Sequence, residues 1–367
     1  RANSAGLPPP PSCPAPESAA PAPPRRSSPP PGPALQYSAA QGLPELREWI
    51  AAQATAQRGQ RVDPSQVIVT AGALQALDVV SKALIDPGDV IAIDDPAFPA
   101  SLHCLRMYQP EVLAVDVDDN GMDVETLAER LEGGHRPKLV YTVATCHNPT
   151  GATMTVPRRI RLAQLAERYG FAVVEDDPYS ALRFRGEPVP PISAYSDRVL
   201  TLGSFSKTLG PGLRIGWVIA PPSLAEPITR AKRWSDLHTS TFVQATLLEL
   251  LDQAGWWDAH VATLPGIYRE RCAALRSAVA AHLGGVLEVN DPAGGLFVWG
   301  RIVAAGISAD DLLDAAVQRG VSFVSGPQFA VHRPDPATLR LSFAGHPPER
   351  LDLAVRRLAE AAASLVG

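Results

Sequence analysis

The chain has 367 residues, of which 46% are hydrophobic, and a formal net charge of −5 at pH 7. This length suits a large domain plus a smaller one, and the acidic balance without a basic stripe argues against a nucleic-acid partner. Without an 18-residue apolar run, a secretory segment or paired cysteine spacing, we expect a cytoplasmic protein with no membrane partner, disulfide framework or metal site.

Residues 1–36 form a Pro-rich N-terminal segment, with prolines at 8–11, 23–24 and 29–31. Proline at this density excludes a regular helix or an inner strand. Two interpretations stay open. The segment is either a flexible extension or, at residues 4–8, a loop that borders a substrate.

From residue 43 onward, helical and strand patterns alternate. Residues 43–58 and 156–169 predict amphipathic helices. Seven short β-rich runs are separated mostly by such helices: 67–70, 90–93, 111–115, 139–143, 172–175, 199–202 and 215–220. The alternation predicts an α/β fold with a doubly wound, mostly parallel, seven-stranded sheet in a large domain at 37–265.

After residue 242 the strand signal weakens, and helices are predicted at 242–253 and 256–282. The remainder alternates strands at 297–299, 321–324 and 339–343 with helices at 310–319 and 347–365. This pattern predicts a smaller α/β domain at 266–367.

Two turn motifs follow strand-like runs. In TAGAL at 70–74, Gly72 stands where a strand turns into a helix. Such a turn exposes backbone N–H groups and can bind an anion, although it is also the ordinary way to make a tight turn. In HNPTG at 147–151, Asn148 follows the run 139–143, and this too is a good turn sequence by itself.

Two charged motifs follow the next strand-like runs. In VVEDDPY at 173–179, Asp176 precedes Tyr179 by three residues, a spacing that also suits a helix or turn cap. In SFSK at 204–207, Lys207 stands just past a strand, and Arg214 follows seven residues later. Such a lysine can form a Schiff base with an aldehyde cofactor, whose phosphate the serines and arginine can bind. A solvated surface lysine is the alternative.

In this order the motifs resemble those of the aspartate aminotransferase superfamily, the fold-type I enzymes that use pyridoxal 5′-phosphate (PLP). The resemblance covers most of the chain, from about residue 4 to the C-terminus. It implies a large PLP-binding domain, a smaller C-terminal domain and a homodimer with a shared active site. It also implies an amino acid and a 2-oxo acid as substrates.

The resemblance implies a role for each motif. Lys207 matches the lysine that binds PLP and moves the proton, and Asp176 the acid that pairs with the pyridine nitrogen. Tyr179 and Asn148 match the pair that hydrogen-bonds the phenolic oxygen. Arg340, in LRLSF at 339–343, matches the arginine that binds the substrate α-carboxylate next to Asn148. The other cofactor contacts implied are a ring on the pyridine (Phe98), the phosphate site (Gly72, Ala73, Leu74, Ser204, Ser206, Arg214) and a tyrosine from the neighbouring subunit (Tyr37).

The chemistry agrees with these roles. PLP accepts electrons only when its ring nitrogen is protonated, and a buried carboxylate raises the pKa of that nitrogen. The lysine must be neutral to act as a base, and burial lowers the pKa of a lysine. A carboxylate is bound best by a planar two-pronged donor, which arginine provides.

DLHT at 236–239 is similar to the 2-aminoadipate aminotransferase branch, and residues 37–47 resemble a Y-x-x-x-x-G-x-x-x-L-R signature of the family. SAGLP at 4–8 resembles the S-x-G-G-x-P opening of one family branch, with Ala5 in place of the first glycine, and Gly6 would border the substrate. The chain also departs from its relatives. Ala73 and Leu74 replace polar residues at the phosphate site, and His147 replaces a glutamine, where it either tunes the cofactor or satisfies the turn.

Three functions remain open at this stage. The leading hypothesis is a PLP-dependent aminotransferase that moves an amino group from an L-amino acid to a 2-oxo acid by a ping-pong route. The second keeps the cofactor and makes the protein a cyclase, lyase or oxidase of a biosynthetic pathway. The third is a non-catalytic sensor of PLP or an amino acid. A dicarboxylate substrate needs a second cation. Arg230, Lys232 and Arg233 are candidates, although we expect all three to lie at the surface.

Overall fold

The computed structural model describes residues 33–366. Its larger unit is built on a sheet whose central strands are buried along almost their whole length. The spatial order is β1 (Val67–Thr70), β8 (Gly216–Ile219), β7 (Val199–Ser204), β6 (Ala172–Asp176), β5 (Leu139–Thr142), β2 (Val90–Asp95), β3 (Glu111–Asp118) and β4 (Gly121–Met122). The α/β fold class is confirmed, but the sheet has eight strands and not seven. The extra strand, β4, is a two-residue antiparallel partner of β3 and too short to carry a periodic pattern.

The middle of this sheet is parallel, and one edge is antiparallel. β3, β2, β5, β6 and β7 run parallel to one another. β8 pairs antiparallel with both β7 and β1. The carboxyl ends of β5, β6 and β7 therefore meet at one edge of the sheet, where doubly wound folds bind ligands.

Helices cover both faces of the sheet because its strands are apolar on both sides. On one face, Ile91 and Ile93 of β2 pack with α2 (Ala73–Leu84), α3 (Pro99–Arg106) and α6 (Pro222–Asp236). On the other, Ala92 packs with α4 (Val124–Glu132) and α5 (Val156–Tyr169). A third cluster joins α1 (Pro44–Arg58) and α7 (Thr241–Leu251) to β1 and β8.

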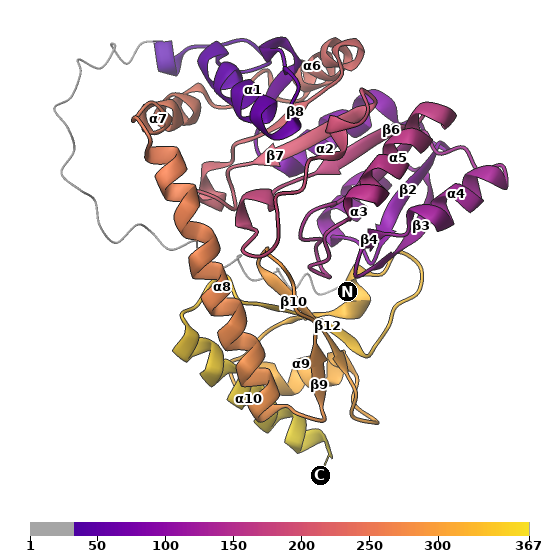
Figure 1. Ribbon diagram of the computed structural model, residues 1–367, viewed down its shortest axis with the longest axis vertical. Helices are drawn as coiled ribbons and strands as arrows, with labels where there is room; N and C mark the ends of the chain where they lie inside the picture. Colours follow the sequence, from indigo (N-terminus) through magenta and orange to yellow (C-terminus); the bar gives the residue numbers. More distant parts are fainter. Residues whose placement is uncertain (1–32, 367) are drawn as a thin grey trace, which may run out of the picture.

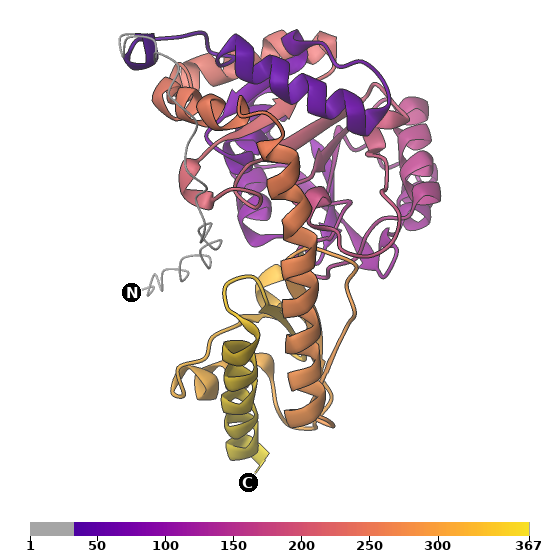
Figure 2. The same ribbon diagram turned by 60° about the vertical axis from the view of Figure 1, so that its left-hand side comes forward.

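A smaller unit follows, as the sequence predicts. Its antiparallel sheet has the order β11 (Val324–Ser325), β12 (Thr338–Ser342), β10 (Phe297–Ile302) and β9 (Leu287–Val289). It packs with α8 (Trp256–His282), α9 (Ala309–Val317) and α10 (Pro348–Val366). Figures 1 and 2 show α8 running from the large unit into the small one, so the predicted division at residue 265 falls inside a continuous helix. Short 3-10 helices lie at Pro33–Leu35, Pro64–Gln66, Ser180–Leu182, Ile192–Ala194, Pro211–Leu213 and Gly326–Phe329.

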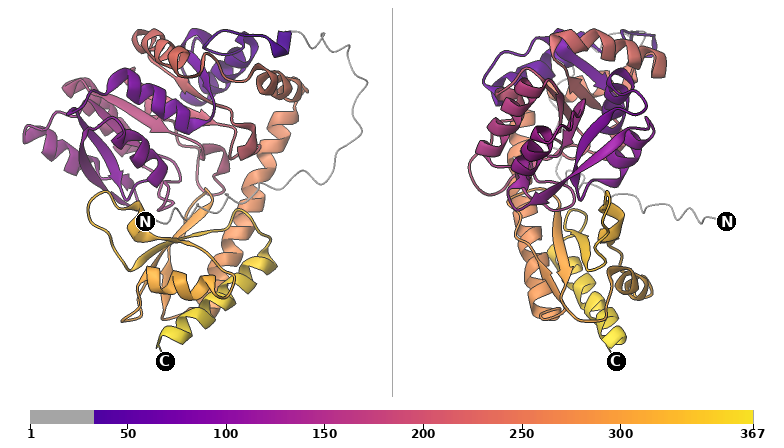
Figure 3. Two further views of the ribbon diagram at one scale, coloured as in Figure 1. Left: turned by 180° about the vertical axis from the view of Figure 1, so that it is seen from behind. Right: turned by 90° about the vertical axis from the view of Figure 1, so that its right-hand side faces the viewer.

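The views from behind and from the side separate the two sheets clearly (Figure 3). Within residues 33–366, no helix is long and apolar enough to cross a membrane. In the same range, no three His, Cys, Asp or Glu side chains gather where they could hold a metal ion. The predictions for residues 1–32, including the one for Gly6, lie outside the described residues.

Candidate active site

The predicted site residues follow neighbouring strands of the large sheet. Asp176 is the last residue of β6 and Ser204 the last of β7, while Asn148 lies in the loop after β5. β5, β6 and β7 are adjacent and parallel, so their carboxyl ends bring these residues to one edge. Lys207 lies in the turn just beyond Ser204 and is partly buried.

Asp176 has one oxygen bound and one without a partner. The Tyr141 hydroxyl donates a 2.7 Å hydrogen bond to Oδ2 of Asp176 and lies 2.7 Å from Ser101 Oγ. The other oxygen, Oδ1, is buried and has no hydrogen-bond partner among residues 33–366. Burial raises the pKa of Asp176 to about 6, while the Tyr141 bond and the charge of Lys207 oppose the shift. A buried carboxylate oxygen without a donor fits the protonated ring nitrogen of a pyridine.

Arg340, on β12, lies against the loop of Asn148. Its Nη1 donates a 2.6 Å hydrogen bond to Asn148 Oδ1, and its guanidinium carbon lies 4.0 Å from the ring centroid of Phe297 and 5.0 Å from that of Phe329. Its Nε is buried without a partner, and no ion pair joins it to a carboxylate among residues 33–366. Burial lowers the pKa of Arg340 to about 10. A partly buried guanidinium without a carboxylate partner loses hydration that no protein charge replaces, and it therefore suits an anionic ligand.

Tyr179 lies in the same buried group. Its ring packs edge-on against Phe297, with centroids 6.2 Å apart, and only 4% of Tyr179 is exposed. Burial raises the pKa of the Tyr179 hydroxyl, whereas the charge of Arg340 and a hydrogen bond with Asn148 oppose that rise. The hydroxyl thus stays protonated and can donate.

The turn before α2 is shaped for a close approach. Gly72 has φ +92°, and a Cβ atom there would lie 2.3 Å from Nη2 of Arg214. That Nη2 donates a 2.8 Å hydrogen bond to the carbonyl of Ala71. The first N–H groups of α2, from Ala73 and Leu74, have no partner inside the helix, so an exposed arginine meets an open helix N-terminus as in anion sites.

The two serines lie on the other side of this turn. The Ser206 N–H donates a 3.0 Å hydrogen bond to Ser204 Oγ, and Ser204 Oγ donates to the carbonyl of Ile215 over 3.4 Å. Ser204 therefore braces the SFSK turn. Phe98 caps α3 and is partly exposed, whereas Tyr37 is 83% exposed and packs edge-on against His238 at 5.8 Å.

Some buried polar residues were not predicted by the sequence reasoning. Arg159 of α5 pairs with Glu175 of β6 at 3.0 Å, with both side chains 1% exposed, and it also donates to the carbonyl of Ala144 and to Oγ1 of Thr145. The pair fixes the start of the loop that carries Asn148. A charged residue at an apolar position of the predicted helix 156–169 was the signal that could have indicated this buried ion pair.

His147 was singled out by the sequence and satisfies its turn. Its Nδ1 lies 2.9 Å from Thr150 Oγ1, while its Nε2 faces Asp94 Oδ2 at 3.4 Å. Lys232 was expected at the surface, and that expectation is wrong. Its side chain is 0% exposed, and its Nζ pairs with Asp236.

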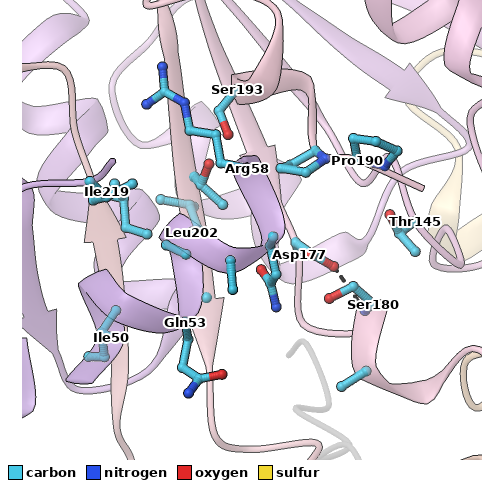
Figure 4. A pocket seen from close by; sticks show the side chains of 18 of the residues that line it. Ile50, Gln53, Arg58, Thr145, Asp177, Ser180, Pro190, Ser193, Leu202 and Ile219 are labelled. Atoms are coloured by element: carbon cyan, nitrogen blue, oxygen red, sulfur yellow. Dashed lines mark hydrogen bonds between the residues drawn. The ribbon is translucent and has the colours of Figure 1, made fainter. Parts of the chain in front are cut away.

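One cavity, of about 770 Å³, lies on the α1 side of the sheet. The side chains in Figure 4 include those of Ile50 and Gln53 from α1, Leu202 from β7, Ile219 from β8, and Asp177 and Ser180 from the segment after β6. Ser204 lines this cavity, whereas Lys207, Tyr179 and Arg340 do not. The cavity therefore reaches the end of β7 but not the lysine or the arginine of the site.

Comparison with known proteins decides the family. The family model "Aminotransferase class I and II" matches residues 16–358. The chain belongs to the class I and II aminotransferases. It is 38% identical to aromatic-amino-acid aminotransferase 1 of Thermococcus litoralis over 89% of this chain and 79% of the relative.

Solved aminotransferases have the same fold. Kynurenine aminotransferase of Pyrococcus horikoshii, in complex with PMP, is 34% identical with a TM-score of 0.85, covering 91% of this chain and 83% of that one. The α-aminoadipate aminotransferase of Thermus thermophilus, complexed with N-(5′-phosphopyridoxyl)-L-leucine, is 34% identical with a TM-score of 0.84 over 91% of this chain and 84% of that one.

This protein is thus a fold-type I, PLP-dependent aminotransferase that resembles the 2-aminoadipate branch. Its substrates are an amino acid and a 2-oxo acid. The relatives support transamination, and they give no support to the cyclase, lyase, oxidase or sensor hypotheses. The free oxygen of Asp176 and the cradle between Gly72 and Arg214 fit PLP.

Proposed function

We propose that this aminotransferase holds PLP between Asp176, Lys207 and the Gly72–Arg214 cradle and transfers amino groups from L-amino acids bound by Arg340. The observation that carries this proposal is the partly buried guanidinium of Arg340, whose buried Nε has no partner among residues 33–366 and whose Nη1 donates to Asn148. It presents a two-pronged donor beside the strand ends that carry Asp176 and Lys207.

The residues described above would hold the cofactor. Asp176 Oδ1 would accept a hydrogen bond from the ring nitrogen, and Tyr179 and Asn148 would donate to the phenolic oxygen. Phe98 would stack on the ring. Ser206, Arg214 and the N–H groups at the start of α2 bind the phosphate, and Ser204 orients Ser206. When bound, PLP supplies a sink for the electrons released as the Cα–H bond of the amino acid breaks.

The proton moves through Lys207. Once the amino acid has displaced it, the neutral Nζ of Lys207 takes the proton from Cα. Arg340 meanwhile holds the α-carboxylate, so that the Cα–H bond keeps one orientation. The same groups then act in reverse on the 2-oxo acid.

The proposal includes a homodimer in the cytoplasm, with Tyr37 donating to the partner's cofactor phosphate. Large exposed side chains support a contact surface here: Leu35 is 71% exposed, Tyr37 83%, Phe242 60% and Leu237 51%. Apolar side chains gathered in this way mark interaction surfaces. A large domain at 37–265 and a small domain at 266–367 complete the proposal.

Visible absorbance of the purified holoprotein tests the function. We expect a cofactor band that disappears on addition of a donor and returns with a 2-oxo acid. Aromatic amino acids, 2-aminoadipate and kynurenine come first because the relatives carry these names. The Lys207→Ala variant is the control and should bind PLP without this exchange. A wild-type protein that shows no band with added PLP would exclude the role of Lys207.

The dimer needs its own measurement. Light scattering of the full chain should give twice the monomer mass. The Tyr37→Phe variant should keep that mass and bind PLP less tightly. A monomer that turns over at the full rate would contradict the shared site.

A further inference from the structure

Lys232 is a fully buried lysine outside the site described above. It lies on α6, its side chain is 0% exposed, and its Nζ lies 2.7 Å from Oδ1 and 3.0 Å from Oδ2 of Asp236. Burial lowers the pKa of Lys232, and the bond to Asp236 opposes that shift. An ion pair in such a place rarely adds stability over apolar residues of the same size, so another role is worth seeking.

The pair leads directly to the turn before α2. Gln75 Nε2 donates a 2.7 Å hydrogen bond to Asp236 Oδ2. Gln75 Oε1 accepts a 2.6 Å hydrogen bond from the N–H of Ala71. The carbonyl of Ala71 accepts from Nη2 of Arg214 over 2.8 Å. Four consecutive contacts thus join Lys232 to the arginine of the phosphate cradle.

Two of these contacts restrain the backbone of the turn directly at Ala71. Gln75 returns its side chain to a backbone N–H just before the helix, as the glutamine of a capping box does. Ala71 is thereby held from its N–H and from its carbonyl. Because Gly72 follows at φ +92° and leaves room for the guanidinium, a small rotation of Ala71 would move Arg214.

Asp236 is itself held at both ends. Its carbonyl accepts a 2.7 Å hydrogen bond from the N–H of His238, with Leu237 between them at φ 63° and ψ −61°. This is the rare and strained form of the γ-turn. Helix α6 ends at this turn and packs against α2, and the carboxylate of Asp236 accepts its hydrogen bond from Gln75 of α2.

We propose that Lys232 and Asp236 are positioning residues that act through Gln75 to hold the phosphate-binding turn at Ala71 and Gly72. Lys232 orients the carboxylate of Asp236, and Asp236 orients the amide of Gln75. The chain of contacts determines how tightly the protein binds the phosphate of PLP. This inference rests on the proposed function, because it assigns the cradle to that phosphate.

Binding of PLP and of pyridoxal to the apoprotein separates this role from a general one. Pyridoxal carries the same aldehyde without the phosphate. Loss of one hydrogen bond in the chain corresponds to about a tenfold change in affinity. We therefore expect Gln75→Ala and Asp236→Asn to weaken PLP binding about tenfold, with pyridoxal binding changed less than about twofold.

The matched control lies on the same two helices. Lys82 of α2 donates a 2.8 Å hydrogen bond to Ser235 of α6 near the surface, so Lys82→Ala removes a bond between α2 and α6 outside the chain. It should leave both affinities unchanged. Gln75 is partly exposed, which makes Gln75→Ala informative even where a change at buried Lys232 prevents folding.

Three results would overturn the inference. An equal loss of PLP and pyridoxal affinity together with a lower Tm would mean that these contacts only stabilise the fold and do not position the phosphate-binding turn. Unchanged PLP affinity in Gln75→Ala and Asp236→Asn would show that the Lys232–Asp236 pair does not affect the phosphate-binding turn. A wild-type apoprotein that binds no PLP would overturn the proposed function as well, so the two failures are distinguishable.

Discussion

Arg340 and Asn148 contact each other across the two sheets, with Nη1 of Arg340 donating to Oδ1 of Asn148 over 2.6 Å. The small unit thus contributes its arginine directly to a loop of the large unit. A carboxylate bound by Arg340 therefore lies next to a side chain proposed to contact the cofactor.

Replacing Arg340 with lysine should raise KM for the amino acid by roughly 10- to 100-fold. Lysine keeps the charge but loses the planar fork, and hydrogen bonds to charged groups contribute about 1.5–3 kcal/mol. Steady-state kinetics with a saturating 2-oxo acid measures the change. The control is Arg301→Lys, because Arg301 of β10 makes an exposed ion pair with Asp335. An equal effect of both variants would contradict the role of Arg340.

Gly72→Ala should weaken PLP binding about tenfold or more, because its Cβ would lie 2.3 Å from Nη2 of Arg214. The matched variant is Gly88→Ala, at φ +87° with no atom within 4 Å of the added Cβ. Both carry the strain of alanine at positive φ, about 1–2 kcal/mol, and only Gly72→Ala disturbs the cradle. Cofactor titration and Tm of both variants make the comparison. A similar loss of PLP affinity in Gly88→Ala would assign the effect to strain alone.

Arg159→Met should reduce the free energy of unfolding by about 3–5 kcal/mol, because it leaves Glu175 buried without its partner. Arg161→Met on the same helix is the control, since Arg161 pairs with Glu125 at the surface and such pairs contribute about 0–1 kcal/mol. Urea unfolding of the two variants provides the measurement. Should both cost the same, the buried pair does not brace the Asn148 loop.

PLP affinity should depend on the protonation of Asp176. Its pKa in the protein is about 6, against an ordinary value of 3.8, so the carboxyl group is protonated at pH 5 and ionised at pH 7. Pairing with a protonated ring nitrogen needs the ionised form. Below pH 6 the affinity should therefore fall about tenfold per pH unit, beyond the change seen in Asp176→Asn.

The Asn variant removes this titration and keeps that of the cofactor itself. If PLP affinity changed with pH in the same way in the wild type and in Asp176→Asn, the pairing of Asp176 with the ring nitrogen would be refuted. The same shift has a consequence for the apoprotein. Because the folded-state pKa is raised, this group favours the folded state most below pH 3.8, and that contribution is lost as the pH rises to about 6.

The fold was largely predictable because its strands are short apolar runs separated mostly by amphipathic helices. β4 was missed because two residues carry no period. Lys232 was wrongly expected at the surface because a lysine in a helix usually lies in water. Its partner Asp236 is in turn bound by Gln75, which belongs to a helix far away in sequence. The contact of Arg340 with Asn148 likewise spans the two units, and only the family resemblance suggested these two as neighbours.

Gly216 is pressed against the turn that carries Gly72. A Cβ atom on it would lie 2.6 Å from the carbonyl carbon of Gly72 and 2.7 Å from the nitrogen of Ala73, and it pairs with Thr70 across β1 and β8. The phosphate cradle is therefore assembled by the pairing of the first strand with the last strand of the large sheet. Pairings between segments so distant in sequence are slow to form, so a chain that can hold the phosphate has already paired β1 with β8. Cofactor capture then reports that these two strands have met.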